Sequence, residues 1–268
     1  MMPWLNGQLL AAGAAWIDPA DRGFTLGDGL FETIRVRDGA AVWLDRHLAR
    51  LAEGSAVLGI PARFGDAALA EACAAVIAAE GIEAGVLRLT VSRGTGPRGV
   101  LPPAVPTPTV LIAGHAGLPP QGPVALVVAR GTCRNQASPL SRVKSLNYLD
   151  AVLARREAAE RGANDAVMLN TAGRVAETTI ANLFARIDGV WATPPVAEGA
   201  LPGIMRAEVL ARLGAVERPL AVADLQRAEA LLLTNALSIR AASRLDGTTL
   251  SAGEDAAAGL RQELRLPA

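Results

Sequence analysis

The side chain with the clearest chemical potential is the amine of Lys144, because it is the one lysine in the chain. The 268 residues contain 26 lysines and arginines, of which 25 are arginine. An arginine side chain stays protonated in proteins and cannot act as an amine nucleophile. A single lysine against that background is a candidate for forming a Schiff base or moving a proton. The alternative is a surface lysine that is single by chance.

Two further segments could complement such an amine. In RVAETTIANLF, an extended chain would place Glu177 on one face with Thr179 and Ala181. A carboxylate among small groups could hold a protonated pyridine nitrogen, whereas an exposed strand glutamate is the alternative. Gly203 opens a predicted helix, and the N–H groups of a helix start can bind an anion. An amine, an acid and an anion site together are what pyridoxal 5'-phosphate (PLP) requires.

The composition excludes several other classes of protein. Hydrophobic residues make up 51% of the chain and the formal net charge is zero, which favours a packed globular protein without a basic nucleic-acid surface. Cys73 and Cys133 are widely separated, and with His47 and His115 as the only histidines no metal site is predicted. No apolar run reaches the roughly 20 residues of a membrane span, and no signal peptide is recognisable. We therefore expect a cytoplasmic protein with neither nucleic-acid nor membrane partners.

The order of predicted elements favours a mixed α+β (α/β) protein with two domains. Hairpin turns are predicted at Asn6-Gly7 and Asp38-Gly39, and helices are predicted to end at Gly59 and Gly81. A stretch rich in glycine and proline is the predicted linker. The expected organisation is a small N-terminal α/β domain, an interdomain linker and a larger C-terminal domain that carries Lys144, over residues 1–114, 115–123 and 124–268.

Several ordered segments between Leu5 and Gly247 resemble the class IV aminotransferases, which are fold-type IV PLP enzymes. They are DRGFTLGDGLFETIRV (21–36), HLARL (47–51), VSRGTGPRG (91–99), RVKSLNYL (142–149), RVAETTIANLF (174–184) and LPGIMR (201–206). The resemblance implies an enzyme with PLP as cofactor, bound at the interface of two domains. It also implies a homodimer whose substrates are small molecules, namely amino acids and 2-oxo acids.

The same resemblance assigns roles to individual residues. Lys144, in the K-S-x-N segment, would be the catalytic residue and form the Schiff base, and Glu177 would pair with the ring nitrogen of the cofactor. Arg50, in H-x-x-R-L, would bind the phosphate. Further cofactor contacts are expected from Ile204 and Met205 in the helix start G-I-x-R and from Tyr148, the tyrosine after K-S-x-N. The strand segment TNAL is expected to contribute Asn235.

The resemblance leaves three reactions open. Arg98 matches the arginine with which D-amino-acid aminotransferases bind a substrate carboxylate, although Phe31 and Val100 replace the tyrosine and histidine that accompany it there. With Arg98 and Phe31 as substrate-binding residues, an aminotransferase of the D-amino-acid type is favoured. One alternative is a 4-amino-4-deoxychorismate lyase of the folate pathway, which yields 4-aminobenzoate and pyruvate. The other is a branched-chain L-amino-acid aminotransferase.

Overall fold

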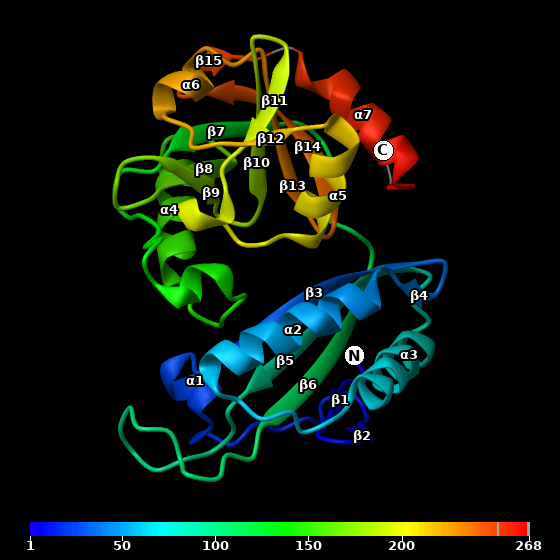
Figure 1. The fold of residues 1–268 in the computed structure, drawn as a ribbon. Helices are drawn as coiled ribbons and strands as arrows, with labels where there is room; N and C mark the ends of the chain where they lie inside the picture. The colour runs from blue at the N-terminus through cyan, green and yellow to red at the C-terminus, as the bar shows by residue number, and fades with distance from the viewer. Residues whose placement is uncertain (251, 267–268) are drawn as a thin grey trace. The chain divides into compact units, whose positions relative to one another are not determined.

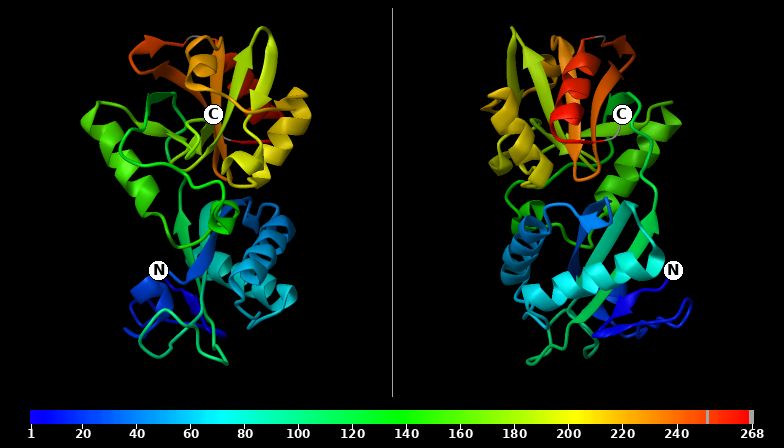
Figure 2. Two further views of the ribbon diagram at one scale, coloured as in Figure 1. Left: turned by 60° about the vertical axis from the view of Figure 1, so that its left-hand side comes forward. Right: turned by 90° about the vertical axis from the view of Figure 1, so that its right-hand side faces the viewer.

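In the computed structural model, which describes residues 1–250 and 252–266, the chain forms two units (Figures 1 and 2). Unit 1 comprises Met1–Pro119 and Val143–Asn147, and unit 2 comprises Pro120–Arg142 and the chain from Tyr148 onward. The segment with Lys144 therefore packs within unit 1, whereas the sequence placed it in the C-terminal domain. The boundary lies within the predicted linker.

Unit 1 is an antiparallel sheet with two long helices on one face. Its strands follow the order β2-β1-β6-β5-β3-β4. The elements are β1 (Trp4–Leu5), β2 (Gln8–Leu9), α1 (Arg22–Leu26), β3 (Gly29–Arg37), β4 (Ala40–Ala41), α2 (Leu44–Leu58), α3 (Asp66–Glu80), β5 (Ala84–Ser92) and β6 (Thr109–Ala116). Strand β6 extends two residues into the predicted linker, and helix α1 was not predicted from the sequence.

The predicted turns and helix ends of unit 1 are confirmed. Asn6 and Gly7 have φ values of 51° and 108° between β1 and β2, as a tight two-residue hairpin turn requires. Gly59 and Gly81 follow α2 and α3 in the left-handed conformation, in which glycine carries no side-chain penalty.

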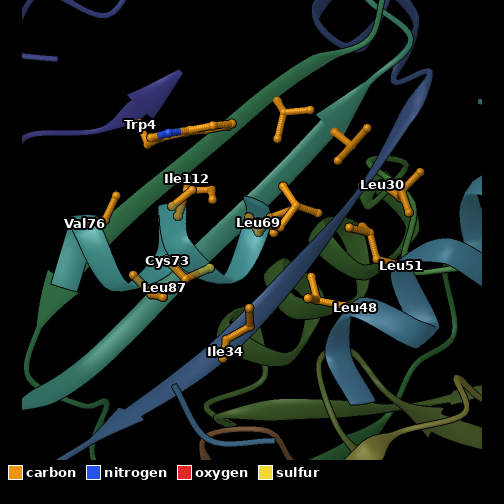
Figure 3. Packing of buried hydrophobic residues seen from close by; sticks show 14 of the residues in the cluster. Trp4, Leu30, Ile34, Leu48, Leu51, Leu69, Cys73, Val76, Leu87 and Ile112 are labelled. Carbon is orange, nitrogen blue, oxygen red and sulfur yellow. The ribbon is translucent and has the colours of Figure 1, made fainter. Parts of the chain in front are cut away.

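The hydrophobic core of unit 1 lies between α2, α3 and one face of the sheet (Figure 3). Because side chains alternate along a strand, Leu30, Ile34 and Val36 of β3 face the helices while Phe31 faces the other side. The labelled side chains that meet in this core are Trp4, Leu30, Ile34, Leu48, Leu51, Leu69, Cys73, Val76, Leu87 and Ile112. The alternation gives β3 one core face and one face for the residues described below.

Unit 2 contains a mixed sheet in the order β12-β11-β10-β13-β14-β7-β8-β9, with β15 paired to β14. Strand β7 is parallel to both of its neighbours, β14 and β8. The strands are β7 (Val124–Val128), β8 (Asp165–Leu169), β9 (Val175–Thr178), β10 (Asn182–Ile187), β11 (Val190–Thr193), β12 (Val216–Glu217), β13 (Ala230–Asn235), β14 (Ser238–Leu245) and β15 (Thr248–Thr249). The helices are η1 (Pro139–Arg142), α4 (Leu149–Glu160), η2 (Val196–Glu198), α5 (Ile204–Leu213), α6 (Val222–Gln226) and α7 (Gly253–Glu263).

Two local features of unit 2 differ from expectation. Strand β9 ends at Thr178 and the chain turns before β10, so Thr179 and Ala181 do not share a strand face with Glu177. Strand β14 was not anticipated; it pairs with β13 and supports α7, which lies alongside both strands in Figure 2. None of the helices in the described residues is long and apolar enough to cross a membrane.

Candidate active site

The lysine segment is held against β3 by backbone hydrogen bonds. The amide of Phe31 donates to the carbonyl of Lys144 at 2.9 Å, and the amide of Leu146 donates to the carbonyl of Gly29 at 2.9 Å. Val143, at the start of the segment, is buried in the core of unit 1. This pairing, over more than a hundred residues of sequence, explains why the segment belongs to unit 1.

Lys144 and Arg88 both contact the ring of Phe31. The lysine Nζ lies 4.5 Å and the guanidinium carbon of Arg88 lies 3.7 Å from the ring centroid, so the two cationic groups are at most 8.2 Å apart, the sum of these distances. Strand pairing of Thr33 with Arg88 and of Phe31 with Thr90 places all four on the sheet face away from the core. Phe31 was predicted at the substrate site, but Arg88 was missed. The charge at Arg88 in an apolar strand was a usable signal.

Arg50 is bound to a buried carboxylate on the opposite face of β3. Its Nε and Nη2 donate to the two oxygens of Glu32 at 2.9 and 2.6 Å. Nδ1 of His47, one turn earlier on α2, lies 2.7 Å from the same carboxylate. The side chains of Glu32 and His47 are each only 1% exposed. Arg50 was predicted from the sequence, but Glu32, which orients its guanidinium, was not.

The charges of this cluster follow from its burial and its hydrogen bonds. Burial opposes ionisation of Glu32, but the hydrogen bonds and charges of His47 and Arg50 outweigh burial and lower its pKa. Burial also lowers the pKa of His47, and Glu32 offsets this only in part. An ionised carboxylate only accepts hydrogen bonds, so a neutral His47 donates from Nδ1. The cluster is thus one carboxylate that neutralises one guanidinium.

Glu177 is held in place by several donors within unit 2. Arg134 Nη2 forms an ion pair with Glu177 Oε1 at 3.2 Å, and the amide of Leu201 donates to Oε2 at 3.0 Å. Asn182 Nδ2 makes a longer contact of 3.4 Å to the same oxygen. Glu177 is buried. Arg134 and Asn182 were not identified from the sequence, although Asn182 lies in the quoted motif.

Strand β13 carries a buried polar group without a partner. The hydroxyl of Thr234 is fully buried, and among the described residues it has no hydrogen-bond partner. Thr234 on β13 is the register partner of Asn182 on β10, so both side chains lie on one sheet face. A Cβ on Gly203, the N-cap of α5, would come within 2.1 Å of Asn182 Oδ1. Thr234 is therefore paired in register with a residue whose side chain packs against the N-cap of α5, and the first N–H groups of that helix lack intrahelical acceptors.

The remaining predicted residues have more local roles in the structure. Asn235 Oδ1 accepts from the amides of Leu237 and Ser238 at 2.9 and 3.1 Å and closes the turn between β13 and β14. Tyr148 is the N-cap of α4. Arg98 is exposed on the loop between β5 and β6. The described residues contain no group of three His, Cys, Asp or Glu side chains that could hold a metal ion.

Comparison with known proteins decides the family. A family model described as amino-transferase class IV matches residues 29–245. This chain belongs to the class IV aminotransferases. It is therefore an enzyme of a PLP-dependent family, and the expected family, fold class and cofactor are confirmed.

Relatives within the family differ in the reactions for which they are named. The chain is 30% identical to a D-alanine aminotransferase of Bacillus licheniformis over 92% of this chain and 89% of the relative. The structure of a 4-amino-4-deoxychorismate lyase from Pseudomonas aeruginosa is similar with a TM-score of 0.85 and 34% identity, covering 98% of both chains. A branched-chain aminotransferase from Thermoproteus uzoniensis has a TM-score of 0.90 and 26% identity, covering 98% of this chain and 94% of the other.

Proposed function

We propose that this enzyme transfers an amino group between an amino acid and a 2-oxo acid, with D-amino acids as the favoured donors. The contact of Arg88 and Lys144 with one Phe31 ring carries the proposal. A guanidinium can bind a carboxylate through two parallel hydrogen bonds. An acid held by Arg88 would present its α-carbon, which adjoins the carboxylate, toward the one amine side chain of the protein.

The residues present fit the cofactor of the family. When bound, PLP supplies an aldehyde for amino groups and a ring that withdraws electrons from the α-carbon. The buried hydroxyl of Thr234 and the start of α5 at Ile204 and Met205 support a phosphate site in unit 2. Because Asn235 closes a turn with its side chain, we give the phosphate contact of this strand to Thr234 instead. Arg50 remains a further proposed contact of the phosphate.

Each catalytic task then has a residue of the chain. Lys144 would attach the cofactor and, when displaced by substrate, would take the proton from the α-carbon at Nζ and deliver it to the aldehyde carbon (C4′) of the cofactor. Glu177 would hold a proton at the ring nitrogen, with Arg134 fixing the orientation of its carboxylate. Tyr148, next to α4, would lie beside the ring. Lys144→Arg preserves the charge and should abolish covalent attachment of PLP, which mass spectrometry after borohydride reduction would detect.

A second candidate is the lyase reaction, which releases 4-aminobenzoate and pyruvate from aminodeoxychorismate. The 34% identity to the Pseudomonas aeruginosa lyase over 98% of both chains favours it. A parallel assay decides between the reactions, with D-alanine, L-leucine and aminodeoxychorismate as substrates and 2-oxoglutarate as acceptor. Because two of these reactions yield pyruvate, glutamate and 4-aminobenzoate must be measured. Glutamate formed from D-alanine would support the proposal. If 4-aminobenzoate is the only product, the enzyme is the lyase. If glutamate forms only with L-leucine, the enzyme has the branched-chain activity.

The carboxylate role of Arg88 has a matched control in unit 1. Arg46 also stacks on an aromatic side chain, with its guanidinium carbon 5.8 Å from the Trp43 ring centroid. Arg88→Met should raise KM for every acid, whereas Arg46→Met should leave KM unchanged. Arg98→Ala should likewise raise KM for the acids without loss of PLP. If the Arg98 variant keeps normal kinetics, the preference for D-amino acids loses its support.

The quaternary structure implied by the family is also a proposal. We expect a homodimer, with a mass in light scattering of twice the 27.6 kDa of one chain. A mass of 27.6 kDa at assay concentration would contradict it.

A further inference from the structure

The loop from Gly94 to Pro108 carries Arg98 and has little regular structure of its own. It connects β5 to β6, and Arg98, Val100 and Leu101 on it are exposed. A loop of this length and exposure would sample many conformations unless other residues restrain its backbone. At residues 99–101, directly after Arg98, the restraint comes from one side chain of α1.

Arg22, the first residue of α1, holds the carbonyls of consecutive loop residues. Its Nη1 donates to the carbonyl of Gly99 at 3.0 Å and its Nη2 donates to that of Val100 at 2.9 Å. A longer contact of 3.4 Å joins Nη1 to the carbonyl of Leu101. The guanidinium of Arg22 thus faces the backbone of the loop at the residues that directly follow Arg98.

The guanidinium itself is fixed from the other side. The Nε of Arg22 donates to Asp28 Oδ2 at 2.8 Å, and the Arg22 side chain is only 4% exposed. Arg93 donates to both oxygens of the same Asp28 but sends its other donors to the carbonyls of Leu58 and Gly59. The two arginines therefore share a carboxylate, and only Arg22 reaches the loop.

The geometry calls for an arginine. The planar guanidinium of Arg22 donates to a carboxylate from Nε and to two or three carbonyls from Nη1 and Nη2. The ammonium group of a lysine has a single nitrogen and cannot span these acceptors. The backbone of Gly96 also passes close by, because a Cβ there would lie 3.0 Å from Cδ of Arg22. The loop is folded around this side chain.

We propose that Arg22 is a positioning residue for substrate recognition, which sets the backbone at residues 99–101 and so the direction of Arg98. This inference rests on the proposed function, in which the loop of Arg98 takes part in binding the substrate carboxylate. Arg22 touches neither substrate nor cofactor in this scheme and acts only through the loop.

The test compares Arg22→Met with Arg93→Met in the PLP-loaded enzyme. Both changes remove an arginine that pairs with Asp28, but only Arg22→Met removes the hydrogen bonds to the carbonyls of Gly99 and Val100. Trypsin cleavage after Arg98 measures loop opening directly, since the bond it cuts adjoins the carbonyl held at Gly99. We expect cleavage there to accelerate on the order of tenfold in Arg22→Met, for the loss of two or three hydrogen bonds, and to stay within about twofold of wild type in Arg93→Met.

Kinetics give the second readout. Arg22→Met should raise KM for amino acids on the order of tenfold while kcat and PLP absorbance stay near wild type, and Arg93→Met should leave KM unchanged. Equal cleavage and equal KM shifts in the two variants would overturn the proposal in favour of general destabilisation. Faster cleavage without a KM change would overturn the role in recognition.

A variant on the loop side covers the case in which Arg22→Met does not fold. Gly99 has φ +111°, where other residues are strained, and a Cβ there meets nothing within 4 Å. Gly99→Ala should therefore disturb the loop backbone alone and reproduce the rise in KM, and an unchanged KM would refute the proposal. If the wild-type enzyme transaminates no acid, the proposed function fails, while the cleavage comparison still reports on the clamp.

Discussion

Replacing Glu32 by glutamine tests whether one buried carboxylate holds Arg50 in place. The side chain of Glu32 is 1% exposed and that of Arg50 is 11% exposed, so neither charge can be screened well by water. The glutamine amide would keep one acceptor oxygen, but its NH₂ group would face the donors of His47 and Arg50 that the carboxylate now accepts from. The Arg50 guanidinium would also lose its counter-ion. We therefore expect Glu32→Gln to destabilise unit 1.

The size of the effect follows from the burial of the pair. Removing one partner of a buried ion pair costs about 3–5 kcal/mol, because the remaining charge is uncompensated. The retained acceptor and the partial exposure of Arg50 place the expected loss near the lower limit, about 3 kcal/mol. Replacing both charges with groups of similar volume removes the uncompensated charge, so Glu32→Gln combined with Arg50→Met should cost at least about 2 kcal/mol less than the sum of the single changes.

Urea unfolding of the PLP-free protein measures these free energies without a contribution from cofactor affinity. Tryptophan fluorescence reports mainly on unit 1, which holds Trp4, Trp16 and Trp43, whereas Trp191 lies in unit 2. If the effects of the two single changes add to within about 0.5 kcal/mol in the double variant, Glu32 and Arg50 are not coupled and the reasoning is wrong.

Three further results are expected. Burial holds the pKa of His47 in the folded chain below its ordinary value of about 6.5, so the unfolded chain binds more protons as pH falls below that value. Stability should therefore decrease from about pH 6.5 downward. Urea midpoints measured across this range should show a smaller decrease for His47→Gln. Burial raises the pKa of Cys73 to about 12, so iodoacetamide at neutral pH should label the exposed Cys133 and leave Cys73 unmodified in mass spectra; labelling of both would contradict the burial. Gly203→Ala should cost about 1–3 kcal/mol of stability and lower the thermal midpoint, because its Cβ would clash with a neighbouring side chain. Gly259→Ala is the control: it lies inside α7 with nothing within 4 Å of the added Cβ, so it should be neutral or stabilising by up to about 1 kcal/mol.

Features governed by neighbouring residues were predictable from the sequence. The Asn6-Gly7 turn and the helix ends at Gly59 and Gly81 depend on backbone angles that particular residue types favour, and each is present. Strand β14 and helix α1 were not predicted from the sequence. Helix α1 is only five residues long, and β14 carries arginines at Arg240 and Arg244 that obscure its apolar alternation.

The amino-acid sequence by itself determined which chemistry is available. Its one amine side chain, Lys144, and its family segments identify a PLP enzyme, because the reactive groups of a side chain do not depend on the fold. Only the tertiary structure decided which groups meet. Lys144 and Arg88 meet at the Phe31 ring, Glu32 meets Arg50, and Arg22 meets the loop of Arg98. These contacts come from strand register and from packing between separate elements of the chain. No local pattern encodes such contacts, because each requires the backbone of two distant elements to be fixed first.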